Sequence, residues 1–294
     1  MWLAPLFAAV LALGGCGVFW SRHRVARLPQ IPLKSATLSQ LVQRVNDLAN
    51  RIQTLDAKLL LVASTGGPRS GSVIEYKDIV AYLLVRKPAD IRLLGQFSIF
   101  GTVFDMVSNG QTFQLSIPPK NEFFLGHNNV IPKHVKNPLE KLRPQVILDA
   151  LLINPILPGQ QVAAMNDQSE LRAQYTLLVL APGANSVDRL VRKVVFSRYD
   201  LEPREEVIYE PSGAVATVVQ FGEFVPVQGI PFPSQIVIRR PQDEYSIRML
   251  MQHVTLNQPL RASQFTLRPP PGSHIVHLSA NTMSAGAAGP GGRR

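Results

Sequence analysis

The chain has 294 residues, of which 46% are hydrophobic and 17% are charged, and its formal net charge is +10. At roughly 100–200 residues per domain, this length corresponds to one large or two ordinary domains. The single cysteine excludes a disulfide framework and a cysteine-rich zinc site, and the apolar content excludes an extended polyelectrolyte.

Residues 1–15 have the character of a signal peptide that ends at the only cysteine. Their apolar run, residues 3–13, is shorter than the ~20 apolar residues that a membrane-spanning helix needs. It ends in Leu13-Gly14-Gly15-Cys16, which is similar to the bacterial lipobox, where the cysteine thiol receives a diacylglycerol. We therefore expect removal of residues 1–15 and lipidation of Cys16. An ordinary signal peptide or a buried thiol is the alternative.

Residues 16–35 are expected to form a lipidated N-terminus and a tether. This stretch has four Lys or Arg residues and no acidic residue: Arg22, Arg24, Arg27 and Lys34. Two or more acyl chains anchor a protein stably, and a basic stretch beside them would lie against anionic headgroups. A solvated basic tether is the alternative. Gly17 occupies the position where Asp favours inner-membrane retention in proteobacterial lipoproteins, so it indicates the outer membrane.

Two segments have the apolar periodicity of amphipathic helices. Over residues 38–52 apolar residues recur at i, i+3, i+4 and i+7, and Ser35 or Thr37 can cap the first turn. The second segment, residues 137–151, opens with an Asn-Pro-Leu-Glu start that is typical of a capping box. Pro144 is expected to divide this segment into two short pieces.

Strand patterns dominate the rest of the chain. They cover residues 57–64, 73–86, 90–98, 102–108, 111–117 and 122–126 before the second helix, and 172–181, 189–199, 204–210, 215–222, 234–240 and 245–254 after it. Asn109-Gly110 between two of them is a strong hairpin signal. Many closely spaced strands favour an antiparallel barrel or sandwich over βαβ units. Residues 279–294 are rich in Gly, Ala and Ser and are expected to be disordered.

Four short segments carry a resemblance to a known family. They are a basic-proline turn at residues 85–92, an Asn-Gly hairpin at 107–113, a turn at 118–122 and a strand entry at 229–238. In this order they resemble the LolA/LolB lipoprotein-localisation family. The resemblance implies a mainly β fold with α over residues 36–268, an incompletely closed antiparallel β-barrel of about eleven strands covered by lid helices. Inside it lies an apolar cavity for acyl chains.

The resemblance also implies site residues. The acyl cavity would be lined by Leu83, Phe104, Met106, Phe113, Leu115, Phe123 and Met249. The lid would involve Val146, Ile147 and Leu151, together with Arg86 and Lys87 at the turn where the soluble carrier of the family has an Arg before the proline. The receptor type carries an apolar membrane-insertion loop, which corresponds to Phe97, Ile99 and Phe100. Core positions in a longer strand are the alternative for these three.

No motif in the sequence indicates catalysis, a cofactor or a metal site. Phosphate-binding loops and nucleophile elbows are absent, and Glu205 and Glu206 would face opposite sides of a strand. His274 and His277 have no third ligand spaced with them and are expected at the surface. The basic excess has no interleaved aromatic residues, which disfavours nucleic acid.

Together, the lipobox and the resemblance imply a non-enzymatic, lipid-anchored envelope protein. It would bind the acyl chains of lipoproteins or phospholipid and transfer them to or within the outer membrane, on the periplasmic face, with a soluble periplasmic carrier as a candidate partner. Two alternatives stay open. An envelope assembly lipoprotein that binds a protein partner would have a filled interior, and an exported hydrolase would need a buried polar constellation.

Overall fold

The computed structural model describes residues 31–97, 101–128, 144–169, 172–183 and 187–278. The chain divides into two units between Pro32 and Leu33, and the second unit contains nearly all of the described residues. The predicted signal peptide, Cys16 and the predicted disordered tail at 279–294 lie outside the described residues.

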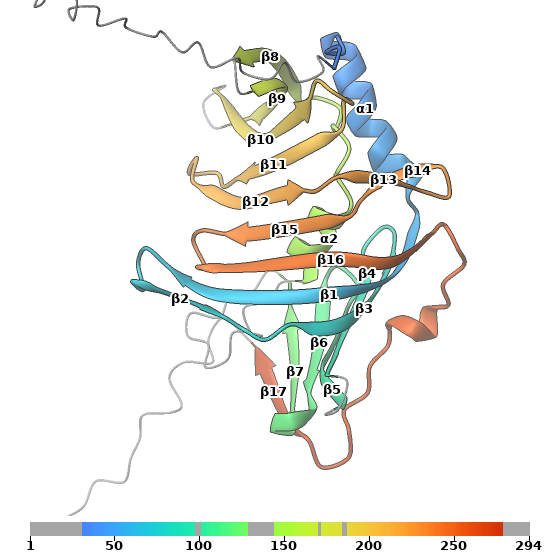
Figure 1. Ribbon diagram of the computed structural model, residues 1–294. Helices are drawn as coiled ribbons and strands as arrows, with labels where there is room; N and C mark the ends of the chain where they lie inside the picture. The colour runs from blue at the N-terminus through green and yellow to red at the C-terminus, as the bar shows by residue number, and fades with distance from the viewer. Residues whose placement is uncertain (1–30, 98–100, 129–143, 170–171, 184–186, 279–294) are drawn as a thin grey trace, which may run out of the picture. The chain divides into compact units, whose positions relative to one another are not determined.

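A large open sheet of 15 strands builds the second unit (Figure 1). Its strand order is β17-β7-β6-β5-β4-β3-β1-β16-β15-β12-β11-β10-β9-β8, with β2 paired to β1. In chain order the strands are β1 (Thr54–Gly67), β2 (Ser72–Glu75), β3 (Ile79–Arg86), β4 (Asp90–Phe97), β5 (Gly101–Ser108), β6 (Thr112–Ile117), β7 (Glu122–His127), β8 (Gln161–Ser169), β9 (Arg172–Pro182), β10 (Asp188–Ser197), β11 (Pro203–Tyr209), β12 (Val215–Phe221), β15 (Gln235–Arg240), β16 (Tyr245–Leu256) and β17 (His274–Leu278).

The sheet curls without closing. Figure 1 shows β8 to β16 stacked one above another, whereas β5 to β7 and β17 run steeply across that direction. The two ends of the strand order, β8 and β17, are not paired to each other. The predicted fold class, an incompletely closed β-barrel with helices, is therefore confirmed.

The strand count is higher than the predicted eleven for identifiable reasons. The expected strand at 73–86 is two strands, because β2 pairs with the far end of β1 and β3 with its near end. Strand β8 was not predicted, since it lies at the sheet edge and its sequence lacks apolar alternation. A small separate sheet forms from β13 (Phe224–Val227) and β14 (Ile230–Pro233). Strand β17 lies beyond residue 268 and pairs in parallel with β7, so the sheet is not wholly antiparallel.

Helix α1 (Leu38–Arg51) begins at the predicted cap. The Thr37 hydroxyl accepts a hydrogen bond from the Gln40 backbone N–H at 3.3 Å, and the Gln40 side chain accepts one from the Thr37 N–H at 2.8 Å. This reciprocal pair is a capping box and satisfies two N–H groups that a helix start leaves free. The apolar face of α1 is buried, including Leu41 and Val45.

Helix α2 (Pro144–Leu151) begins at the proline that was expected to divide the second helical segment. A proline at the first helical position loses nothing, because its missing N–H would have no partner there. The helix contacts β5 and β15. The first half of the predicted segment, up to residue 143, lies outside the described residues.

The space between these helices and the sheet is filled by apolar side chains. Leu48 and Ile52 from the α1 end meet Leu151 of α2 and the rings of Phe221 and Phe232, and the gap left among them is only about 20 Å³. Along β1 the buried residues alternate with the exposed Asp56 and Lys58. Around the end of α1 and α2, the inner face of the sheet is therefore tightly packed.

Candidate functional site

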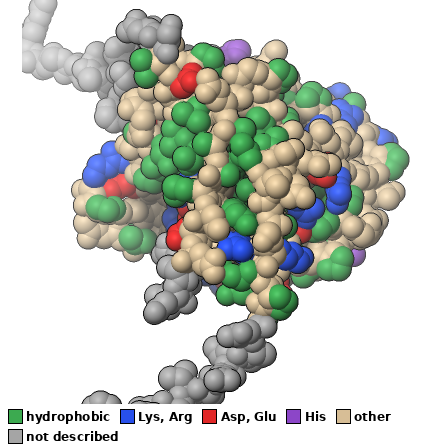
Figure 2. All heavy atoms as spheres, turned by 90° about the horizontal axis from the view of Figure 1, so that it is seen from above, with side chains coloured by type: hydrophobic (Ala, Val, Ile, Leu, Met, Phe, Trp, Pro, Cys, Tyr) green, Lys and Arg blue, Asp and Glu red, His purple; other side chains and the backbone are tan. Residues whose placement is uncertain are grey.

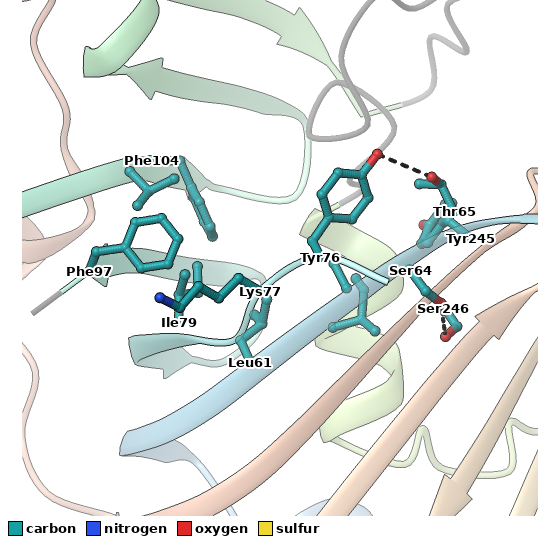
Figure 3. Close-up of a pocket in the computed structure, with 13 residues that line it drawn as sticks. Leu61, Ser64, Thr65, Tyr76, Lys77, Ile79, Phe97, Phe104, Tyr245 and Ser246 are labelled. Atoms are coloured by element: carbon teal, nitrogen blue, oxygen red, sulfur yellow. Dashed lines mark hydrogen bonds between the residues drawn. The ribbon is translucent and has the colours of Figure 1, made fainter. Parts of the chain in front are cut away.

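An apolar pocket of about 320 Å³ opens where β1 passes from one pairing partner to the other (Figure 3). Five strands and the β2–β3 connection contribute to it, and its lining residues are Leu61, Ala63, Ser64, Thr65, Tyr76, Lys77, Ile79, Phe97, Val103, Phe104, Tyr245, Ser246 and Ile247. The deeper side chains, such as Phe104, Leu61 and Ile247, are buried. No residue of α1 or α2 lines it.

Two irregularities of the sheet create this space. Strand β1 pairs with β3 up to Leu61 and with β2 from Ser64, so the connection through Tyr76–Asp78 passes alongside the strand between these points. The pairing of β4 with β5 shifts register between Gly95 and Gln96. A shift of this kind bends a strand and increases its local twist, which opens the sheet beside it.

Gly95 makes room for the ring that forms the pocket floor. It lies opposite Phe104 in the β4–β5 register. A Cβ atom at Gly95 would lie 2.5 Å from Phe104 Cε1 and 2.7 Å from Ile79 Cδ1. The ring therefore occupies the volume that any larger residue at Gly95 would need.

Four hydroxyl groups in the pocket wall pair with one another. The Thr65 and Tyr76 hydroxyls lie 3.2 Å apart, and those of Ser64 and Ser246 lie 3.0 Å apart (Figure 3). Paired hydroxyls cost less to desolvate than free ones, so the wall stays compatible with an apolar ligand. The charged group in the lining is Lys77, whose Nζ lies 6.0 Å from the centre of the Phe97 ring.

Apolar side chains are exposed beside the pocket. Val73 and Ile74 of β2 expose 67% and 58% of their surface, and Tyr76 exposes 38%. They lie on the β1–β2 hairpin and its exit, and this hairpin protrudes from the sheet (Figure 1). On the face shown in Figure 2, hydrophobic side chains gather near the centre while Lys and Arg side chains are scattered around them.

The seven residues predicted to line an acyl cavity are all buried. Of the seven, Phe104 lines the pocket described above. The other six lie elsewhere on β3, β5, β6, β7 and β16 and expose at most 3% of their surface: Leu83, Met106, Phe113, Leu115, Phe123 and Met249. The structure thus places most of the predicted cavity residues in the packed core and one of them at the pocket.

The predicted lid residues divide between two places. Ile147 and Leu151 of α2 are buried and Val146 is half-buried against the same core. The Lys87 ammonium donates a hydrogen bond to the Ala49 carbonyl near the end of α1, not to α2. Burial lowers the pKa of Lys87.

Within the described residues, no hydrogen bond or ion pair joins Arg86 to α2. The Arg86 Nε and Nη2 donate to the Asp90 carboxylate at 2.9 Å and 2.6 Å. Its guanidinium lies 5.0 Å from the centre of the Phe265 ring, in the segment that follows β16. Arg86 and Lys87 thus join the turn between β3 and β4 to the end of α1 and to the C-terminal segment.

Part of the predicted membrane-insertion loop borders the pocket. Phe97, the last residue of β4, is half-buried and lines the pocket wall. Ile99 and Phe100 lie outside the described residues. The loop and the pocket therefore share Phe97, a connection that the sequence did not suggest.

Sequence reasoning missed a buried charged cluster. The Glu206 carboxylate is 1% exposed on the inner face of β11, 3.3 Å from Nη1 of Arg192 on β10. Burial raises the pKa of Glu206 to about 7, because desolvation of its charged form outweighs the attraction of Arg192. Burial also raises the pKa of Asp149 on α2, although Asn154 and Gln145 donate hydrogen bonds to it. Neither carboxylate lines the pocket.

Glu205 and Glu206 do face opposite sides of β11, as their adjacent positions predicted. Glu205 pairs with Lys193 at 3.0 Å on the outer face, and both side chains are 29% exposed. The hydrophobic pattern of this strand does not indicate which glutamate is turned inward, because the next two residues, Val207 and Ile208, are both apolar and show no alternation. The buried one was therefore not distinguishable in the sequence.

Other chemistry is sparse in the part of the chain that the structure describes. There, no three His, Cys, Asp or Glu residues come together in a way that could hold a metal ion. His274 and His277 lie exposed on β17. None of the described helices is both long enough and apolar enough to cross a membrane.

Comparison with known proteins gives a likeness of fold. No family model matches the sequence, and no curated protein matches it. A DUF1329 family protein from Desulfovibrio piger has a similar structure, with a TM-score of 0.50 and 11% identity over 78% of this chain and 95% of the other. A LolA superfamily protein from Nitrosomonas europaea gives 0.47 and 9% over 79% and 99%.

A further similar structure is a domain from Vibrio parahaemolyticus described as an outer membrane lipoprotein-sorting protein. Its TM-score is 0.46 and its identity 10%, over 78% of this chain and 95% of the other. At such identities the likeness extends to the fold alone. The match at a TM-score of 0.50 shows that this chain shares a fold with the Desulfovibrio piger protein. This chain's open, curled sheet with helices is the architecture that the resemblance in the sequence implied.

Proposed function

We propose that this chain is a lipid-anchored envelope protein that binds acyl chains in the apolar pocket beside the β1–β2 hairpin. The chains would come from lipoproteins or lipids and pass to or within the outer membrane. The observation that carries the proposal is the pocket itself, an apolar space of about 320 Å³ within the range of ~300–1,000 Å³ typical of ligand sites.

The surroundings of the pocket support contact with a membrane. Val73 and Ile74 are exposed beside its rim, where burial in lipid would remove apolar surface from water. The lipobox at Cys16, in a part of the chain outside the described residues, would hold the protein at the bilayer. Burial of an apolar chain supplies the driving force, so transfer needs no covalent chemistry on this chain.

Lipid content of the purified protein tests this proposal. Native mass spectrometry and lipid extraction should detect copurified acyl lipid, and a fluorescent fatty acid should bind. Val103→Trp should fill the pocket and abolish binding, whereas Val80→Trp, a half-buried valine outside the pocket lining, should bind as wild type does. A wild-type protein that carries no lipid and binds no fluorescent fatty acid contradicts the proposal.

The anchor is tested separately. Cys16→Ala should leave the protein unprocessed by the lipoprotein peptidase and change its partition between membrane and soluble fractions. Membrane association and processing identical to wild type would mean that Cys16 is not the lipidation site.

A second candidate, an assembly lipoprotein that binds a protein partner, is favoured by the filled space under the helices. The edge strand β8 offers it a binding place, because nearly all of its described residues are exposed and Asp167 is its sole charged residue. An extended peptide can add to such an edge by backbone hydrogen bonds. Photo-crosslinking from Met165 in cells, combined with absence of copurified lipid, would favour this candidate over the first.

A further inference from the structure

The pocket carries a positive charge at its rim with no carboxylate opposite. Lys77 is exposed on the connection between β2 and β3, and no Asp or Glu is among the lining residues. Within the described residues its ammonium makes no ion pair, and it lies over the face of the Phe97 ring, 6.0 Å from the ring centre. Figure 3 shows its side chain reaching past Ile79 toward Phe97. A single charge at the edge of an apolar pocket is arranged to meet the head of an amphiphile.

An adjoining groove adds positive charge. It shares Ser64, Tyr245 and Ser246 with the pocket. Its charged lining residues are Arg69, Arg239, Arg240 and Glu244. With Lys77 the two spaces therefore present four cationic side chains and one carboxylate, which makes the potential at the rim positive.

Two of these arginines are already engaged. Arg69 donates to the Pro241 carbonyl at 3.0 Å, and Arg240 donates to Asp243 at 2.8 Å. Arg239 is exposed and is in no ion pair among the described residues. Lys77 and Arg239 are thus the cations best placed for a ligand, and Lys77 is the one that lines the pocket itself.

The size of the pocket limits the number of chains. At ~10–15 Å³ of such space for each water-sized group, 320 Å³ corresponds to roughly 20–30 methylene-sized groups. One acyl chain fits within that number, whereas the two or three chains of a phospholipid or a mature lipoprotein together exceed it.

If acyl chains bind in this pocket as proposed above, we infer that it takes one chain whose head is anionic, with the head held at Lys77. The head is a carboxylate or a phosphate, as in a fatty acid or a single-chain phospholipid. A lysine ammonium is a compact charge that pairs with either group. The chain lies against the Phe104 and Leu61 side of the pocket and the head lies at the rim.

Displacement of a neutral probe tests this inference on the full chain. Phenylnaphthylamine would be displaced with three ligands that share a twelve-carbon chain: dodecanoate, dodecyl phosphate and dodecanol. We expect the anions to displace the probe at about two- to fivefold lower concentration than dodecanol, the effect of one exposed ion pair. Lys77→Met should abolish that margin and leave dodecanol unchanged. Lys77→Arg should retain it, and higher ionic strength should reduce it.

Lys120→Met is the matched control, because Lys120 is exposed far along the chain and lines neither space. It removes the same charge and should keep the margin. Dodecanol that binds as well as both anions would overturn the inference while still supporting acyl binding. If the anions still displace the probe from Lys77→Met at lower concentration than dodecanol does, the role of Lys77 is overturned. No displacement by any of the three would instead contradict the proposed function. A margin for one anion alone supports the inference and identifies the head as carboxylate or phosphate.

Discussion

The buried Glu206 leads to a prediction about how stability depends on pH. The expected dependence has the opposite sign to that of an ordinary salt-bridged carboxylate. The pKa of Glu206 is raised from 4.5 to about 7, because Arg192 at 3.3 Å does not offset the cost of burying the carboxylate. Between these two pH values the folded state holds a proton that the unfolded state has lost. The free energy of unfolding should therefore fall as pH rises from 4.5 to about 7 and then level off.

The magnitude follows from the same interval. At ~1.36 kcal/mol per pKa unit, the difference between 4.5 and about 7 corresponds to about 3 kcal/mol of stability lost on ionisation of Glu206. Glu206→Gln replaces the carboxyl by a neutral group of similar shape that can still accept from Arg192. The variant should lack most of this fall, and the raised pKa of Asp149 should leave a smaller residual dependence of the same sign.

Urea denaturation between pH 5 and pH 8 measures the effect as a difference between wild type and variant, so any constant offset from the substitution cancels. Glu205→Gln is the control, since it removes a half-exposed carboxylate from the adjacent position of β11 and should keep the wild-type dependence. If wild-type stability instead rises with pH over this range, the attraction of Arg192 for the Glu206 carboxylate exceeds the cost of desolvating that carboxylate. The same fall in wild type and Glu206→Gln would show that other groups cause it.

Three further substitutions test the fold around the pocket and α1. Gly95→Val should force Phe104 into the pocket, with about 1–3 kcal/mol lost in denaturation and weaker probe binding; an unchanged affinity would mean that the ring moves elsewhere. Thr37→Ala removes the cap of α1 and should cost about 1 kcal/mol, whereas Thr37→Ser should retain most of it. Lys87→Met removes the hydrogen bond to the Ala49 carbonyl and should cost about 1 kcal/mol without changing acyl binding; loss of binding would restore a lid role for Lys87.

Local patterns in the sequence predicted the elements whose formation depends on nearby residues. The capping box at Thr37 and the hairpin at Asn109-Gly110 are examples. In the hairpin the Asn109 side chain accepts from the backbone N–H groups of Gln111 and Thr112 at 3.0 Å and 2.9 Å. Such turns depend on a few adjacent residues, so their chemistry is visible in the sequence.

Long-range pairing was not visible in the same way. Strand β17 joins β7 after a separation of about 150 residues, with His274 opposite Glu122. Nothing local in the β17 segment specifies that partner. Edge strand β8 was missed for the complementary reason that an exposed strand needs no apolar alternation. Alternating hydrophobicity marks strands that cover a core, and these two cover little.

The sequence could not indicate which buried residues border the pocket, because a hydrophobic pattern does not distinguish a packed residue from one beside empty space. Leu83 and Met249 were expected to line a cavity on the same grounds as Phe104, and all three are buried. Whether a buried residue borders packed atoms or empty space depends on register. Here the deciding features are the shift at Gly95 and the change of partner along β1. Neither changes the hydrophobic pattern of its own strand.

The pocket lies away from both helices, so a ligand could enter it without passing them. Its walls come from β1, β3, β4, β5 and β16 and from the connection that carries Tyr76 and Lys77, whereas α2 packs over β5 and β15 with Ile147 buried. An acyl chain can therefore reach the pocket from the side of the β1–β2 hairpin without displacing α2. The exposed Val73 and Ile74 lie on that side, so the surface that would touch a membrane and the opening that would receive the chain are adjacent. Under the proposed function, acyl binding would therefore not require α2 to move as a lid.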